Sequence, residues 1–311
     1  MSESFNASDI YARLAGTGLI KNRDGTYAPD PTIIPVPATP NPSPLNAVAS
    51  KDIIVNHVKP TWMRLYVPTT ALNGGVSSKK LPLVVFYHGG GFLTHSFDYE
   101  PVEDFCNLMA RQLNVVVASA SYRRGTETRL PAVYDDGVAA VEWIKNSEHE
   151  WIKSHADLSN VFLMGTHSGG NVAYNVCLRF VDTDLRPLRI RGLILHEPFF
   201  GGVERCESEL RHVNDQILRD FCWEIRLPVG ADRDHKYSNP RVGGGPEDME
   251  KIGRIRCKVM VIGEGGSALI DRQRDVANLM KEMGVDVVEC FTDRDPDVLA
   301  YITSIIYSSA P

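Results

Sequence analysis

The sequence predicts a doubly wound α/β domain built on a mostly parallel sheet. The first observation is that short apolar runs alternate with stretches of helical periodicity from Leu81 almost to the end of the chain. Parallel strands covered on both faces form continuous apolar runs in this way. The second observation is the segment Val161–Asn171, where four apolar residues stop at a glycine and small residues lead into a helix-compatible stretch. Neither observation requires a domain boundary in this part of the chain.

The composition is that of a globular protein with a sizeable core. The chain has 311 residues, 43% hydrophobic and 23% charged, with a formal net charge of −6. This balance argues against a nucleic-acid or anionic-membrane partner. No apolar run approaches the roughly 18 residues that a membrane span needs, and Met1–Asn6 has no features of a secretory signal. The six cysteines are scattered without a CxxC pair, as buried reduced thiols are. We therefore expect a cytoplasmic monomer or homodimer with a small-molecule partner.

The predicted architecture has an arm, a main domain and an insertion. Residues 1–50 are expected to form an N-terminal cap or arm, because the proline-rich stretch Pro29–Pro44 favours extended backbone. Residues 51–311 are expected to form the main domain. An insertion at about 199–253 is expected to form a lid beside the carboxyl edge of the sheet.

Eight segments of the main domain are predicted as strands, of which the first two form an antiparallel pair. They are Asp52–Val55, Met63–Val67, Leu83–Tyr87, Val115–Ala120, Val161–Met164, Leu193–His196, Val259–Ile262 and Val285–Phe291. Apolar residues at helical spacing predict a helix around Val138–Ile144, with Asp135 or Asp136 as its cap. A second helix is predicted around Val276–Met283, and Gly284 is expected to end it.

The segment Gly165–Gly169 has the spacing of a nucleophile elbow. In that turn a strand leads sharply into a helix, and the central residue is exposed at the edge of the sheet. His167 stands where the central serine is usual. Ser168 does not replace that serine, because a shift of one residue points its hydroxyl away from the tip of the turn. The chemistry of the elbow is therefore expected to be that of an imidazole.

A glycine-rich loop follows the predicted strand that ends at Tyr87. The N–H groups of Gly89, Gly90 and Gly91 can face a cavity without side-chain obstruction, as an oxyanion hole requires. We expect these glycines to form such a hole together with the amide of Ser168.

These motifs resemble those of the plant carboxylesterase branch of the hormone-sensitive-lipase-like α/β-hydrolases. The resemblance extends from about residue 45 almost to the end of the chain. It is carried by His88–Phe92, Tyr122–Arg123, Arg129–Asp136, Gly165–Asn171 and Leu269–Gln273. It implies an α/β-hydrolase fold with an N-terminal cap, and an active site with an oxyanion loop, an elbow serine, an acid and a histidine.

The resemblance places a different residue at each position of the catalytic triad. The serine position falls on His167 and the acid position on Ser267. The histidine position falls on Asp297 when it is counted without a gap, and on Asp293 or Asp295 after a small shift. An aspartate in the middle place would orient His167, but it is a poor base for an alcohol. Ordinary serine-esterase turnover is therefore not expected.

The resulting functional hypothesis is a non-hydrolytic enzyme of plant specialised metabolism. We expect a cyclase, lyase or isomerase that acts on a small apolar metabolite such as an alkaloid. His167 would be the base, Asp297 its orienting partner, and the glycine loop would hold developing negative charge. Alkaloid cyclases, an isoflavanone dehydratase and gibberellin receptors resemble the same branch.

Two alternatives stay open, an inactive small-molecule receptor or scaffold and residual carboxylic ester hydrolysis. No cofactor is expected. No metal is expected either, because His167 and Asp297 lack a third ligand at a suitable spacing.

Overall fold

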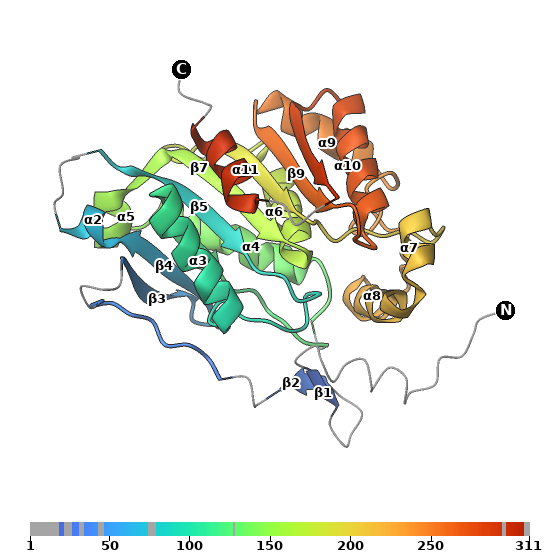
Figure 1. Ribbon diagram of the computed structural model, residues 1–311, viewed down its shortest axis with the longest axis horizontal. Helices are drawn as coiled ribbons and strands as arrows, with labels where there is room; N and C mark the ends of the chain where they lie inside the picture. The colour runs from blue at the N-terminus through green and yellow to red at the C-terminus, as the bar shows by residue number, and fades with distance from the viewer. Residues whose placement is uncertain are drawn as a thin grey trace.

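An eight-stranded sheet forms the centre of the protein in the computed structural model (Figure 1). The structure describes residues 19–21, 27–30, 34–42, 47–73, 79–126, 128–293 and 297–307. The strands of the sheet are β3 (Val48–Asn56), β4 (Thr61–Pro68), β5 (Leu81–Tyr87), β6 (Val116–Ala120), β7 (Ala156–Thr166), β8 (Ile190–His196), β9 (Lys258–Glu264) and β10 (Val287–Thr292). Two short strands, β1 (Leu19–Lys21) and β2 (Tyr27–Pro29), pair separately.

The strand order is β10-β9-β8-β7-β5-β6-β4-β3. β4 pairs antiparallel with both β3 and β6, and the remaining neighbours are parallel. The predicted doubly wound, mostly parallel sheet and its antiparallel first pair are therefore confirmed. β7 begins five residues before the predicted Val161, because Ala156 and Asp157 extend its pairing with β5 beyond a register shift.

Helices cover both faces of the sheet. One face carries α3 (Glu100–Leu113) and α11 (Val298–Tyr307), whose buried side chains share a hydrophobic cluster. The other face carries α4 (Ala132–Lys145), α6 (Ser168–Phe180), α9 (Gly245–Arg254) and α10 (Ile270–Glu282). Two short helices, α2 (Thr69–Leu72) and α5 (Glu150–His155), also contribute side chains to the hydrophobic cluster of this second face. Side chains of β5 alternate between the two clusters and all but the first are buried, which explains the continuous apolar runs.

The helix ends agree with the sequence in one case and differ in another. α10 ends at Glu282, and Gly284 follows with φ of 76°, as predicted. The predicted cap of the earlier helix is wrong, because α4 begins at Ala132, before Asp135 and Asp136. The buried Asp136 carboxylate instead accepts hydrogen bonds from the backbone N and Nε of Arg123, at 2.9 and 2.8 Å.

The insertion between β8 and β9 lies beside the strand ends. It contains α7 (Glu207–Arg211) and α8 (Val213–Arg226), which lie apart from the two helical layers in Figure 1. The predicted insertion at about 199–253 extended too far, because α9 lies within it and packs on the sheet face through Met249 and Ile252. The predicted boundary at residue 50 falls inside β3, so the sheet already begins within the segment assigned to the arm. That residues 1–50 act as a cap stays a prediction. Among the described helices, none is both long and apolar enough to span a membrane.

An ionic network around the buried Arg64 fastens the antiparallel edge of the sheet to α3. Arg64 on β4 binds Asp52 through two nitrogens, at 2.6 and 2.9 Å, and Glu103 on α3 at 2.8 Å. The Tyr66 hydroxyl also donates to Glu103, at 2.6 Å. Because the buried Arg64 and Glu103 are paired and have further hydrogen bonds, their burial is tolerated. Removing Glu103 would take away the buried carboxylate that Arg64 and Tyr66 both bind.

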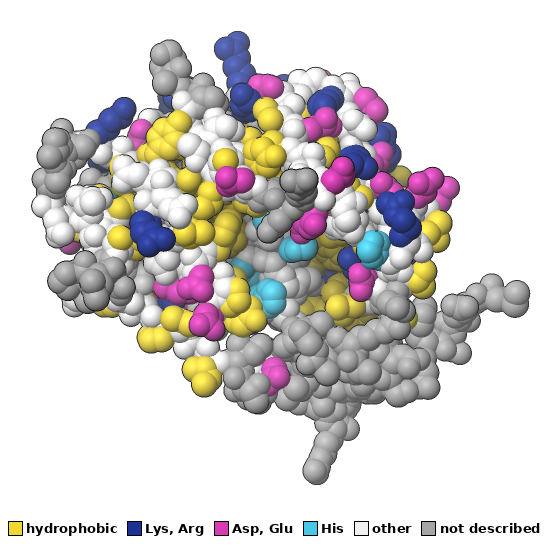
Figure 2. Space-filling view, in the orientation of Figure 1, with side chains coloured by type: hydrophobic (Ala, Val, Ile, Leu, Met, Phe, Trp, Pro, Cys, Tyr) yellow, Lys and Arg dark blue, Asp and Glu magenta, His cyan; other side chains and the backbone are white. Residues whose placement is uncertain are grey.

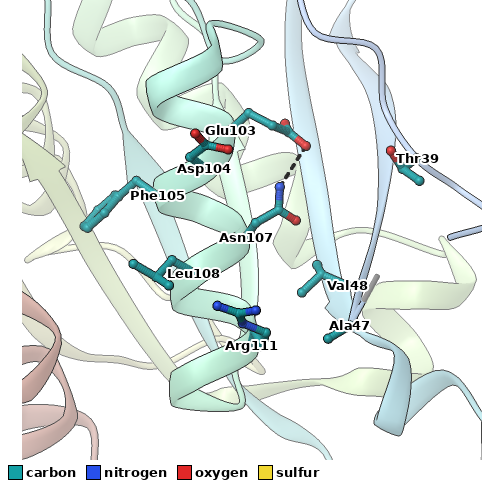
Figure 3. A pocket seen from close by; sticks show the side chains of 9 residues that line it. All are labelled: Thr39, Ala47, Val48, Glu103, Asp104, Phe105, Asn107, Leu108 and Arg111. Carbon is teal, nitrogen blue, oxygen red and sulfur yellow. Dashed lines mark hydrogen bonds between the residues drawn. The ribbon is translucent and has the colours of Figure 1, made fainter. Parts of the chain in front are cut away.

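A cavity of about 560 Å³ lies next to this network (Figure 3). One wall is α3, and the other is the segment that leads into β3, with Thr39, Ala47 and Val48. Asn107 donates to the second carboxylate oxygen of Glu103 there, at 3.0 Å. Both oxygens of the Glu103 carboxylate therefore already accept hydrogen bonds. This gives Glu103 a structural role at the cavity.

Replacing Glu103 by alanine should lower the free energy of unfolding by about 3 kcal/mol, because it removes the buried carboxylate that the buried Arg64 and Tyr66 side chains both bind. Asp104→Ala is the matched control, since Asp104 is the next residue of the same helix and is exposed. It should change the free energy by less than about 0.5 kcal/mol. Urea unfolding of both variants measures the difference, and equal effects would contradict the assigned role of the network.

Candidate active site

His167 occupies the tip of a sharp turn between β7 and α6. Its backbone has φ of 50° and ψ of −118°, a strained conformation for a residue with a side chain. The turn also needs glycine nearby, since a Cβ on Gly169 would lie 1.9 Å from the carbonyl oxygen of Tyr87. The predicted elbow frame is therefore present, with an imidazole at its tip.

Backbone hydrogen bonds hold this turn against the adjoining strand. His167 N donates to the carbonyl of His196 at 3.0 Å, and Phe199 N donates to the carbonyl of His167 at 3.0 Å. The buried Asn171 side chain adds a bond from Nδ2 to the carbonyl of Phe199, at 3.1 Å. The elbow and the segment after β8 are thus fastened together on both sides of His167.

The carboxylate beside the His167 ring belongs to Glu197. Nε2 of His167 lies 3.1 Å from Oε2 of Glu197. The two residues meet because β7 and β8 are parallel neighbours with Thr166 opposite His196, so the next residue of each strand leaves the sheet at the same point. Glu197 is held there by its own N–H, which donates to the carbonyl of Ile262 on β9 at 2.7 Å.

The two members of this pair differ in their exposure to solvent. The His167 side chain is 48% exposed, whereas that of Glu197 is 16% exposed. The hydrogen bond from His167 lowers the pKa of Glu197, against the opposing effect of burial, and the positive charge of Arg219 adds to the lowering. Glu197 therefore stays ionised and can fix the orientation of the imidazole.

His167 lines a cavity of about 320 Å³. Histidine side chains gather around a hollow on this face of the molecule, with hydrophobic side chains beside it (Figure 2). The cavity wall combines apolar groups with the glycine loop and a few polar side chains, and it consists of Gly90, Gly91, Leu93, Thr94, His95, His167, Ser168, Phe199, Leu218, Arg219, Cys222 and Leu269. A mostly apolar cavity with few polar groups is typical of small-molecule sites.

Three backbone amides are available to a ligand in this cavity. Gly90 and Gly91 have φ of 104° and 61°, conformations that favour glycine. In the part of the chain that the structure describes, no group accepts a hydrogen bond from the N–H of Gly90, Gly91 or Ser168. Gly89, which was predicted with them, does not line the cavity. Its carbonyl instead accepts a hydrogen bond from Nδ1 of His88, at 2.8 Å.

His88 is a structural residue of the glycine loop. It is fully buried, and its ring stacks on Tyr122 with 4.4 Å between the ring centroids. Burial lowers the pKa of His88 to about 3, so the ring is neutral near pH 7. The Tyr122 hydroxyl donates to the carbonyl of His88, at 2.7 Å, and completes the support of the loop.

The structure places the predicted Ser267 and Asp297 in other contacts. The Ser267 hydroxyl accepts a hydrogen bond from Leu269 N at 3.2 Å, just before α10. The Asp297 carboxylate is exposed and accepts a hydrogen bond from Ala300 N at 3.0 Å, at the start of α11. In place of the predicted Asp297, Glu197 is the carboxylate that contacts His167. Asp297 follows β10, which β9 and β8 separate from β7 in the sheet.

Sequence reasoning missed Glu197, although a signal was present. The predicted strand Leu193–His196 is followed at once by a charged residue, just as the elbow histidine follows its own strand. Of the alternatives to Asp297, Asp293 is exposed and Asp295 lies outside the described residues. Within the described ranges, His, Cys, Asp and Glu side chains form no group of three that could hold a metal ion.

Comparisons with known proteins agree with this fold. Residues 84–294 match the family described as alpha/beta hydrolase fold. Carboxylesterase 20 from Arabidopsis thaliana is 58% identical over 300 residues, which cover 94% of this chain and 91% of that protein. The gibberellin receptor GID1C from the same plant is 34% identical over 265 residues, covering 81% and 74%.

Solved structures show the same fold at lower sequence identity. An esterase of Pyrobaculum calidifontis has a TM-score of 0.67 and 22% identity, and the match covers 83% of this chain and 85% of that one. Together with the strand order and the elbow, these likenesses establish that the chain belongs to the α/β-hydrolase fold family, among the carboxylesterase-like proteins.

Proposed function

We propose that this protein is a proton-transfer enzyme, a lyase, cyclase or isomerase that acts on a small molecule with a carbonyl group. The single observation that supports this proposal most is the contact between His167 and Glu197 at the tip of the elbow. A histidine oriented by a carboxylate is a common general base. It stands where a hydrolase of this fold presents its nucleophile.

Glu197 would determine which ring nitrogen of His167 acts. When Nε2 carries its hydrogen toward Oε2 of Glu197, the lone pair of Nδ1 is left to accept a proton from the substrate. The Glu197 carboxylate would also stabilise the imidazolium that forms. This role is the one that the sequence assigned to Asp297.

The amides of Gly90, Gly91 and Ser168 would bind the carbonyl oxygen of the substrate. Removal of a proton from the neighbouring carbon moves an electron pair onto that oxygen, and the amides stabilise the resulting charge. Expulsion of a leaving group then forms a double bond, and the protonated His167 returns the proton to the departing group. The same first step, followed by reprotonation at carbon, gives an isomerisation.

Hydrolysis through a serine nucleophile is not proposed, because both candidate hydroxyls are engaged away from a base. The buried Ser168 hydroxyl accepts a hydrogen bond from Phe92 N, at 3.2 Å. The Ser267 hydroxyl accepts one from Leu269 N. A histidine is needed next to the serine to remove its proton, and the described contacts of these two residues include none.

Two other functions fit parts of the site. Hydrolysis by a water molecule that His167 activates is favoured by the carboxylesterase relatives. Ligand binding without turnover is favoured by an elbow that lacks its nucleophile beside an intact cavity, and by the relative named as a gibberellin receptor. The experiments below separate both from the proposal.

The test of the base uses 5-nitrobenzisoxazole, which ring-opens to a phenolate when a base removes the proton from its C3 carbon. The wild-type protein should turn it over, and His167→Ala should lower kcat/KM by at least about 100-fold, the usual contribution of a general base. His57→Ala is the matched control and should leave the rate unchanged, since His57 is exposed at the β3–β4 turn. Saturable binding without turnover by the wild type would favour the receptor.

A fluorophosphonate that labels activated serines should leave the protein unmodified. The reason is that neither Ser168 nor Ser267 contacts a histidine among the described residues. Intact-mass spectrometry measures the modification, with a serine esterase as the positive control. Labelling of Ser168 would overturn the proposal, whereas hydrolysis of p-nitrophenyl acetate without labelling but dependent on His167 would favour the activated water.

Glu197→Gln should lower the rate with 5-nitrobenzisoxazole by about tenfold, because it removes the charge that orients and stabilises the His167 imidazolium. Glu204→Gln is the control, since Glu204 is exposed a few residues further along. A rate equal to that of the wild type would show that Glu197 does not orient the base.

The lowered pKa of Glu197 also predicts how the stability of the protein depends on pH, and the Glu197→Gln variant tests this prediction. Since the pKa of Glu197 is lowered in the folded protein, its contribution to stability is complete above the unfolded pKa of about 4.3 and is lost as the pH falls through the lower folded value. The difference in unfolding free energy between wild type and variant should therefore shrink below about pH 4.3. A difference that grows on acidification would contradict the assigned pairing.

A further inference from the structure

The lid helix α8 contributes a cation to the wall of the active-site cavity. Leu218, Arg219 and Cys222 lie on one face of this helix and all three line the cavity. The helix is close to the glycine loop, since a Cβ on Gly91 would lie 2.8 Å from Sγ of Cys222. Arg219 therefore lies about one helical turn from Cys222, the residue of α8 that is close to the glycine loop. The N–H groups of Gly90 and Gly91 in this loop are unpaired among the residues that the structure describes.

The guanidinium of Arg219 is poorly compensated by the residues that the structure describes. Its Nη1 is buried, and none of those residues accepts a hydrogen bond from it. Nη2 has a loose contact with Asp215, whose Oδ2 lies 3.9 Å away. The Asp215 side chain is 61% exposed, whereas that of Arg219 is 22% exposed. A guanidinium has five N–H donors, so this environment leaves most of its capacity unused.

Other nearby carboxylates are already committed to other cations. Asp220, the next residue along α8, pairs with Arg205 and with Arg233. Glu209 on α7 pairs with Arg272 at 3.0 Å.

The remaining carboxylate of the site is that of Glu197, whose near contact is His167 rather than Arg219. Arg219 acts on Glu197 through its charge, but no hydrogen bond or ion pair joins the two side chains in the part of the chain that the structure describes, so the N–H groups of Arg219 are not committed to that carboxylate.

The surroundings of Arg219 in the cavity are largely apolar. Leu93, Phe199 and Leu269 line the same space. Burial lowers the pKa of Arg219 from its usual value, although an arginine remains charged near pH 7. A partly desolvated cation that lacks acceptors is stabilised most by an anion that supplies paired oxygen acceptors, and a carboxylate matches the planar guanidinium in this way.

We propose that Arg219 binds the carboxylate of the ligand, so that the cavity accepts small carboxylic acids with an apolar body. This inference rests on the proposed function for its second half, in which the same molecule presents a carbonyl to the amides of Gly90 and Gly91. The apolar body would lie between Phe199, Leu218 and Leu269. The substrate class is then a small acid that carries a separate carbonyl group, rather than a neutral ester.

The test compares 3-phenylpropionate with 3-phenylpropionamide, which have the same apolar body and differ in charge. Isothermal titration calorimetry on the full chain should show that the acid binds at least about tenfold more tightly than the amide, the difference expected for a charge-assisted hydrogen bond. Arg219→Met should reduce this preference to about one, and Arg219→Lys should retain part of it. Arg211→Met is the matched control and should keep the full preference, since Arg211 on α7 is exposed.

Each outcome decides between the assignments. An acid preference that survives in Arg219→Met, or wild-type protein that binds the acid no better than the amide, would overturn the inference. If the protein prefers the acid but does not turn over 5-nitrobenzisoxazole, the proposed function is contradicted and this inference is not. If it turns over 5-nitrobenzisoxazole but does not prefer the acid, this inference is contradicted and the proposed function is not.

Discussion

The backbone pairing of β7 with β8 is the constraint on which the rest of the site depends. Because the two strands are parallel and Thr166 lies opposite His196, the residues that follow them emerge together at the carboxyl edge of the sheet. Two backbone hydrogen bonds, from His167 N to His196 and from Phe199 N to His167, hold the residues that follow β7 and β8 side by side. The proximity of imidazole and carboxylate is thus a consequence of sheet register rather than of flexible side chains. A shift in that register would separate them.

The elbow has a strained backbone geometry with a histidine at its centre. Positive φ at His167 costs energy, and it is maintained by the packing of Gly169 against Tyr87. The same geometry exposes the imidazole on one side while the strand below it stays buried. The scaffold therefore presents whatever side chain occupies this position to the cavity. Changing that residue changes the chemistry without rebuilding the fold.

Charge is distributed unevenly around the cavity. The His167–Glu197 pair lies at the strand ends, the unpaired amides lie on the glycine loop and at the start of α6, and Arg219 lies on α8. The amides and the guanidinium attract negative charge, whereas Glu197 is occupied by the imidazole. An apolar wall between these groups lowers the local dielectric and strengthens each of them. A ligand with two separate hydrogen-bond acceptors can bind both the amides and the guanidinium, whereas a ligand with one acceptor can bind only one of them.

The sequence by itself determined the features that depend on neighbouring residues. The apolar runs gave the strands, the helical spacing gave α10 and its end at Gly284, and the glycine spacing located the elbow and the loop at Gly90 and Gly91. These features could be predicted because strand and helix periodicity and turn chemistry are local properties.

Only the tertiary structure decided which side chains meet. Counting along the chain selected Asp297, yet its carboxylate caps the start of α11, and the strand order brings Glu197 to the imidazole instead. The position of Arg219 in the cavity likewise depends on how the insertion folds back over the glycine loop. Contacts between distant segments are determined by strand order and packing, and neither leaves a periodic pattern in the sequence.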